Sequence, residues 1–221
     1  MNLDLQCCKV GDITAATALF EEMKNLQDFV ARVPPYNTMM QYFVVTSPNR
    51  EKALQYYQDM KRRKVQPSDH TYKLLLDCYG AIQPVDNEAM QSVFGQIERD
   101  RHIEVQGVHW AALINSYGCI QNNLEEAQQV FDSISVHPSS DNGLPDAVCY
   151  EALLNACLVN GKPELVESYV DRLRAQKVHS TAYVENDRIK VSLSLSLTVA
   201  ILTMVTGLCS SRTTRRSPKS L

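Results

Sequence analysis

One triplet in this chain has the spacing of a catalytic metal motif: His102, Ile103 and Glu104. In zinc deaminases a His-x-Glu of this kind places a metal ligand beside a glutamate that moves protons for a metal-bound water. The same chemistry needs a Pro-Cys-x-x-Cys, which the sequence lacks. The triplet also falls between two expected helices, so we interpret it as a chance match in a loop.

The seven cysteines indicate neither a zinc site nor a disulfide framework. Only Cys7 and Cys8 stand together, and no Cys or His residues have the spacing of zinc ligands. An odd number of unpaired thiols is typical of a reducing compartment. Cys78, Cys119 and Cys157 are expected to pack as small apolar side chains near the ends of helices.

Other catalytic signatures are missing as well. The sequence contains no phosphate-binding glycine loop, no nucleophile elbow and no carboxylate cluster like that of the metallonuclease domain of protein-only RNase P. We therefore predict a protein that is not an enzyme and that binds no cofactor or metal. Its function should come from the surfaces that its helices build.

An aromatic residue recurs down the chain, and the same apolar ladder follows it each time. Each ladder has the spacing i, i+3, i+4, i+7, which places its members on one stripe of an α-helix. The ladders are Tyr36, Met39, Met40, Phe43; Tyr72, Leu75, Leu76, Tyr79; Trp110, Leu113, Ile114, Tyr117; and Tyr150, Leu153, Leu154, Cys157. The anchors lie 36, 38 and 40 residues apart, with Tyr183 as a fifth candidate. Such self-similarity predicts a repeat array.

A second apolar ladder begins about 17 residues after each anchor, so every repeat should be a helix, a turn and a helix. Gly80 and Gly118 follow aromatic residues where first helices are expected to end. In the fourth repeat, Gly161 to Pro163 separate the two helices. Hairpins of this size bury their apolar faces only by stacking, so the sequence predicts an all-α solenoid with a concave face.

The repeats resemble those of the pentatricopeptide repeat family, whose first helix opens Tyr-Asn-x-Leu-Ile and whose second helix reads Ala-x-x-x-Phe-x-x-Met. The best copy is Pro35–Thr38 followed by Glu51–Met60. Tetratricopeptide repeats instead need Gly or Ala where this chain has Met40, Leu76, Ile114 and Leu154. The resemblance covers about residues 12–190 and implies a right-handed α-solenoid of helix-turn-helix repeats.

The expected units are a partial N-terminal repeat over residues 1–33, four repeats over 34–68, 69–106, 107–146 and 147–180, and the start of a truncated repeat over 181–190. Residues 191–221 break the pattern, because alternating Ser and Leu lead into an uncharged stretch through Cys209 and then a basic tail. We interpret this shift as a mistaken gene model. A membrane anchor over 191–209 and a disordered or aggregating tail are the alternatives.

The resemblance also implies a function: such arrays hold single-stranded RNA along their first helices, about one base per repeat. In the family, the residue after the first-helix aromatic reads a base together with the last residue of the repeat, and a residue two before the aromatic packs against it. On this chain the reading pairs are Asn37 with Ser68, Lys73 with Gln106, Ala111 with Asp146, and Glu151 with His179; the packing residues are Pro34, His70, Val108 and Val148. Only Asn37 with Ser68 is a usual combination, and it would favour a pyrimidine.

By the same resemblance we expect a mitochondrial accessory factor in RNA processing, stability or translation, with any presequence outside this chain. Charge leaves another function open. Residues 34–180 carry 13 Lys and Arg against 18 Asp and Glu, a net charge of −5, whereas phosphate binding needs local positive potential. The one concentrated basic run, Lys61–Lys64, ends a second helix, where cations also complement the helix dipole. A protein-binding scaffold in a mitochondrial RNA or ribosomal complex is therefore the alternative.

Overall fold

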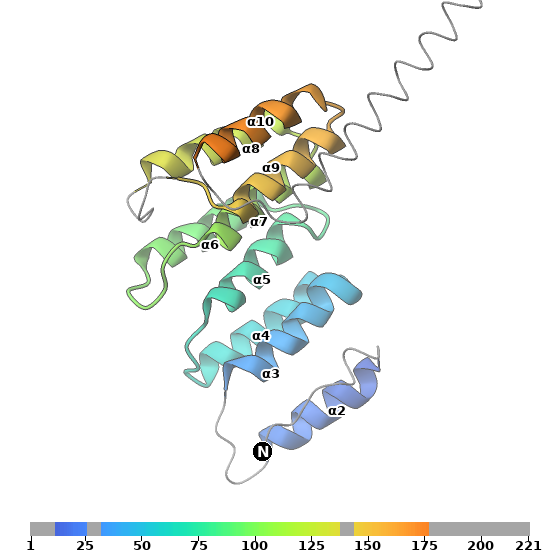
Figure 1. The fold of residues 1–221 in the computed structure, drawn as a ribbon. Coiled ribbons are helices and arrows are strands. Elements are labelled where there is room, and N and C mark those ends of the chain that lie inside the picture. Colours follow the sequence, from blue (N-terminus) through green and yellow to red (C-terminus); the bar gives the residue numbers. More distant parts are fainter. Residues whose placement is uncertain (1–11, 26–31, 138–143, 177–221) are drawn as a thin grey trace, which may run out of the picture.

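The computed structural model describes residues 12–25, 32–137 and 144–176, and every element within these ranges is helical (Figure 1). Tyr183, His179 and the segment 191–221 lie outside the described residues. In the described part of the chain, no helix has both the length and the apolar character needed to cross a bilayer.

The first helices of the repeats lie side by side in one layer (Figure 1). They are α3 (Val33–Gln41), α5 (Asp69–Gly80), α7 (Gly107–Asn115) and α9 (Ala147–Val159). Two of them continue into a single π-helical turn, η1 (Tyr42–Thr46) after α3 and η2 (Ser116–Ile120) after α7. Each first helix packs on the next one in the series.

The second helices form the other layer, and each packs against the first helix that precedes it in the chain. They are α4 (Arg50–Arg62), α6 (Asn87–Arg99), α8 (Leu124–Ser133) and α10 (Glu164–Ala175), with the short 3-10 turn η3 (Ile134–Val136) after α8. Another helix, α2 (Ile13–Lys24), packs on α3. The prediction of an all-α solenoid of stacked hairpins is confirmed, while the residue at which each repeat begins stays a prediction from the sequence.

Short polar residues begin the second helices. Asn49, Asp86 and Asn123 precede α4, α6 and α8, and each side chain accepts a hydrogen bond from the backbone N–H three residues later. Such a cap satisfies one of the backbone donors that have no partner inside the helix. The starts of α4, α6 and α8 are therefore encoded locally, whereas α10 follows Pro163 without a side-chain cap.

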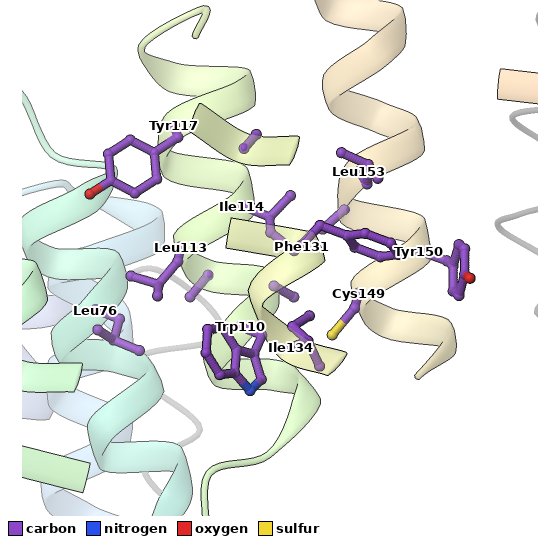
Figure 2. Close-up of a cluster of buried hydrophobic side chains, with 14 of the residues drawn as sticks. Leu76, Trp110, Leu113, Ile114, Tyr117, Phe131, Ile134, Cys149, Tyr150 and Leu153 are labelled. Carbon is purple, nitrogen blue, oxygen red and sulfur yellow. The ribbon is translucent and has the colours of Figure 1, made fainter. Parts of the chain in front are cut away.

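The predicted first-helix ladders are buried except for the half-buried Tyr79, and they connect successive repeats (Figure 2). Each of three anchors packs its ring against a phenylalanine on the second helix of the preceding repeat. The ring centroids are 5.1 Å apart for Tyr36 and Phe20, 4.6 Å for Trp110 and Phe94, and 4.9 Å for Tyr150 and Phe131. Tilted and edge-on pairs at these distances stabilise the packing beyond their buried area. The anchors thus hold one repeat on the next.

Of the two glycines predicted to end first helices, one does so and the other does not. The helix does end at Gly80, but Gly118 lies inside η2, and among the described glycines only Gly161 has a positive φ, +66°. A Cβ on Gly118 would lie 2.4 Å from the Cβ of Ala156 on α9, and one on Gly80 would lie 2.8 Å from Ser116 Oγ. The prediction that Gly118 ends its helix was wrong. Both glycines allow neighbouring repeats to approach closely.

Candidate RNA-binding surface

A stripe of side chains on each first helix lies opposite the buried ladder. Successive residues turn an α-helix by about 100°, so positions −2, +1 and +5 from each anchor share this stripe. We add position +9, which lies inside α9 but falls in η1, just past the end of α5, and in η2 in the other three repeats. We call the set the first-helix face: Pro34, Asn37, Gln41, Val45; His70, Lys73, Asp77, Ala81; Val108, Ala111, Asn115, Cys119; and Val148, Glu151, Asn155, Val159. Asn37 and Ala111 are buried, and the others are exposed or half-buried.

The first-helix face has little charge. It carries Lys73 against Asp77 and Glu151, so one positive and two negative groups give −1. The Lys73 ammonium pairs with Asp77 one turn further along α5, and the two side chains are 38% and 19% exposed. A phosphate that approached Lys73 would therefore compete with a carboxylate that is already in contact.

The predicted reading pair of the first full repeat is brought together. Asn37 Nδ2 donates to Ser68 Oγ at 3.2 Å, across 31 positions of sequence. Ser68 is also the N-cap of α5, where its Oγ accepts from the backbone N–H of Thr71 at 3.3 Å. Thr71 Oγ1 in turn donates to Asn37 Oδ1 at 2.8 Å. The three side chains form one hydrogen-bonded group at the junction of two repeats.

The other predicted pairs have different surroundings. Gln106 is the N-cap of α7, while Lys73 pairs within its own helix. Ala111 is 5% exposed, and Asp146 caps α9 through a hydrogen bond from the backbone N–H of Cys149 at 3.0 Å. The Asp146 carboxylate lies directly over Gly107, where a Cβ would collide with it. Glu151 is half-buried on α9, and its partner His179 lies outside the described residues.

The four predicted packing residues lie near the starts of the first helices. Pro34 and His70 are exposed, Val108 is half-buried, and Val148 is 39% exposed. Each is thus accessible to a flat ring that approaches this end of the first-helix face. Their role in base packing stays a prediction.

The sequence reading missed a row of buried residues that lie directly before the aromatic anchors. Thr71 reaches back to Asn37, His109 Nε2 bonds to the Asp69 carbonyl oxygen at 3.1 Å, and Cys149 Sγ lies 3.5 Å from the Gly107 carbonyl oxygen. Each therefore links its own repeat to the preceding one. The only signal in the sequence was a small or polar residue beside each aromatic, which is too common to predict a contact.

Burial changes the acid–base properties of this row. His109 is completely buried and its Nδ1 accepts from the Gln106 backbone N–H, so Nε2 carries the hydrogen in the neutral ring. Desolvation lowers the pKa of His109, which keeps the imidazole neutral. Desolvation also raises the pKa of the Cys149 thiol. Neither group is suited to hold charge at neutral pH.

The basic run Lys61–Lys64 lies at the end of the second helix α4 and is not part of the first-helix face. Arg62 and Arg63 both pair with Asp59, at 3.2 and 3.3 Å, and the Lys61 ammonium lies 5.5 Å from the centroid of the Tyr57 ring. The Tyr36 hydroxyl donates to the same Asp59, and burial with this contact raises the pKa of Tyr36 to about 12. Lys61, Arg62 and Arg63 therefore have partners on α4 itself.

The deaminase-like triplet has no metal-site geometry around it. His102 and Glu104 lie in the loop between α6 and α7 and are exposed. In the described ranges, no three His, Cys, Asp or Glu side chains gather as they would around a metal ion.

Family models match three segments of the chain. The "PPR repeat family" model matches residues 33–80, and the "PPR repeat" model matches residues 6–27 and 148–178. The first match includes the segment that sequence reasoning selected as the best copy, Pro35–Met60.

The proteins with similar sequences are named as pentatricopeptide repeat proteins as well. The chain is 33% identical over 168 residues to the fission yeast "Pentatricopeptide repeat-containing protein 5, mitochondrial", covering 76% of this chain and 13% of the relative. It is 27% identical to an Arabidopsis thaliana protein, "Putative pentatricopeptide repeat-containing protein At5g59200, chloroplastic", over 83% of this chain and 30% of the relative. The chain thus spans less than a third of either relative.

Among solved structures, the fold is similar to that of the pentatricopeptide repeat protein PPR10, crystallised in complex with an 18-nt psaJ RNA element. The TM-score is 0.60 and the sequence identity 19%, over 89% of this chain and 27% of PPR10. At this identity the likeness concerns the fold.

Proposed function

The chain belongs to the pentatricopeptide repeat family, and on that premise we propose that it binds single-stranded RNA along its first-helix face. One observation carries the proposal: Asn37 and Ser68, the pair that the family resemblance assigns to base reading, are joined by a hydrogen bond. Pro34, three residues before Asn37 on α3, is exposed. The complex of PPR10 with RNA supports the same use of the fold.

We further propose that the protein acts in mitochondria as an accessory factor in the processing, stability or translation of transcripts. The name of the fission yeast relative supports the compartment, whereas the Arabidopsis relative is named as chloroplastic. In this role the chain positions RNA for other components and does not itself cleave it. Incubation of labelled RNA with the purified chain should leave the RNA intact.

The test of RNA binding is a filter-binding titration of the full chain with a randomised single-stranded RNA pool at low and moderate salt. Asn37→Ala should weaken binding by about 2- to 10-fold, since it removes one hydrogen-bonding group from the contact. Gln41→Ala, which removes an exposed amide one turn away on the same face, is the matched control and should change affinity less. Absence of binding by the unaltered chain at low salt would contradict the proposal.

A protein-binding role is the second candidate, and the character of the first-helix face favours it. The face is nearly neutral, and its position +9 is apolar in all four repeats: Val45, Ala81, Cys119 and Val159. Val45 is 64% and Val159 is 49% exposed. Helical-hairpin solenoids also hold peptide segments in such grooves. Recovery of a mitochondrial protein with the unaltered chain, but not with a Val45→Asp, Val159→Asp variant that still folds, would support this role.

A further inference from the structure

We propose that Thr71 is a positioning residue that sets the base preference of Asn37, although it belongs to the following repeat and is not one of the reading residues. The inference rests on the proposed RNA-binding function. The geometry is a closed circuit of hydrogen bonds through three side chains at the junction of α3 and α5.

Thr71 fixes the orientation of the Asn37 amide. Its hydroxyl accepts from the Ser68 backbone N–H at 3.0 Å, and its single hydrogen is given to Asn37 Oδ1 at 2.8 Å. The amide oxygen therefore faces α5, and the amide nitrogen faces Ser68 Oγ. Thr71 is fully buried and Asn37 is 7% exposed, so water has little access to replace these bonds.

The orientation matters because an amide presents a donor at one end and an acceptor at the other. With Oδ1 held by Thr71, the second Nδ2 hydrogen of Asn37 remains for a base, while the Ser68 hydroxyl lies 3.2 Å from Thr71 Oγ1 and donates to it. Without the threonine hydroxyl, the amide could rotate by about 180° and place its oxygen beside Ser68, whose hydroxyl donates as well as accepts. Uracil and cytosine differ at ring position 4, where one has an accepting oxygen and the other a donating amino group. A fixed amide distinguishes these two bases, and a rotating amide does not.

The other junctions lack this arrangement. At the equivalent positions, His109 bonds to the Asp69 backbone oxygen and Cys149 lies near the Gly107 backbone oxygen. Neither bonds to the residue that follows the aromatic anchor of the preceding repeat, since Lys73 pairs with Asp77 and Ala111 has no polar group. Cys149 donates its backbone N–H to Asp146, the other member of its pair, so it does not orient a reading amide as Thr71 does. The first junction is therefore the place in the described residues where a neighbouring repeat can tune base recognition.

The test is selection by the full chain from an RNA pool randomised at every position, followed by sequencing of the bound fraction. We expect one position of the bound RNA to show unequal enrichment of uracil and cytosine, by about 2- to 10-fold, as one hydrogen bond allows. Thr71→Val and Thr71→Ala should bring this ratio to about one at that position alone. Thr71→Ser, which keeps the hydroxyl, should preserve the ratio, and Asn37→Ala should remove it.

The outcomes separate this inference from the broader function. If the unaltered chain binds no RNA, the proposed function fails and the inference fails with it. If the unaltered chain binds RNA without distinguishing uracil from cytosine, or if Thr71→Val and Thr71→Ala keep its preference, the inference alone is overturned. A uniform loss of enrichment at all positions in both hydroxyl-free variants would also overturn it, because that result indicates a purely structural role for Thr71.

Discussion

Gly118→Ala should destabilise the array, although alanine is the better helix former. A glycine inside a helix costs about 1 kcal/mol relative to alanine, so the substitution alone would favour the folded state. Here the new Cβ would lie 2.4 Å from Ala156 Cβ and 3.1 Å from Ala127 Cβ. Neither of these methyl groups can rotate away, so the helices themselves must move apart.

The expected magnitude follows from these opposing effects. Forcing an extra methyl group into a close-packed contact typically costs about 1–3 kcal/mol, and the short distance to atoms fixed on α8 and α9 favours the upper part of that range. After subtraction of the helix-propensity gain, we expect a net loss of about 1–2 kcal/mol. For a domain of this size, that lowers the melting temperature by roughly 2–8 °C.

Gly95→Ala supplies the matched control. Gly95 lies inside α6, and a Cβ there would meet only the flexible ends of Arg99 and Glu98, no closer than 3.5 Å. This variant should be neutral or more stable by up to about 1 kcal/mol. The assay is thermal unfolding followed by circular dichroism at 222 nm. If both glycine variants gain stability, the repeats that contain Gly118 and Ala156 do not pack as described.

Three further outcomes are expected. Trp110→Ala should cost about 3–5 kcal/mol in a urea titration, because the indole is 8% exposed and packs on Phe94 at the junction of two repeats; an unchanged midpoint would contradict the stacking. Burial lowers the pKa of His109 below its ordinary 6.5, so its contribution to stability is complete above about pH 6.5 and decreases as the pH falls below that value. His109→Gln should therefore flatten the loss of melting temperature between about pH 7.5 and 5.5, whereas His102→Gln in the exposed loop should not. Among the cysteines in the described ranges, half-buried Cys119 should react with iodoacetamide before Cys78 and Cys157, because burial raises the pKa of these two thiols to about 11. Peptide mapping after a short pulse measures the order of reaction, and the reverse order would contradict the packing.

The sequence predicted the fold because the information lies in periodic apolar positions. The ladder that begins at Tyr36 or Tyr150 recurs with the same spacing, and only a stack of helical hairpins buries all of its copies. Local signals such as Asn49 and Asp86 then mark where second helices begin. Fold class and helix order therefore needed no knowledge of long-range contacts.

The candidate site was less predictable because it depends on contacts between repeats. Gly118 looks like a helix terminator in sequence, and only the approach of Ala156 shows that it is a packing position. The burial of Ala111 and the bond from Thr71 to Asn37 likewise depend on how closely α3, α5, α7 and α9 stack. A rule that assigns roles by position within one repeat cannot include a residue from the next.

Crosslinking tests the central claim most directly, because it locates the bound RNA on the protein. The full chain would be irradiated in complex with single-stranded RNA that carries 4-thiouridine, and crosslinked peptides would be mapped by mass spectrometry. The account predicts crosslinks within the first helices and their caps, at residues such as Pro34, Asn37, Ser68 and His70. Crosslinks confined to the second helices, in particular to the basic run Lys61–Lys64, would contradict it.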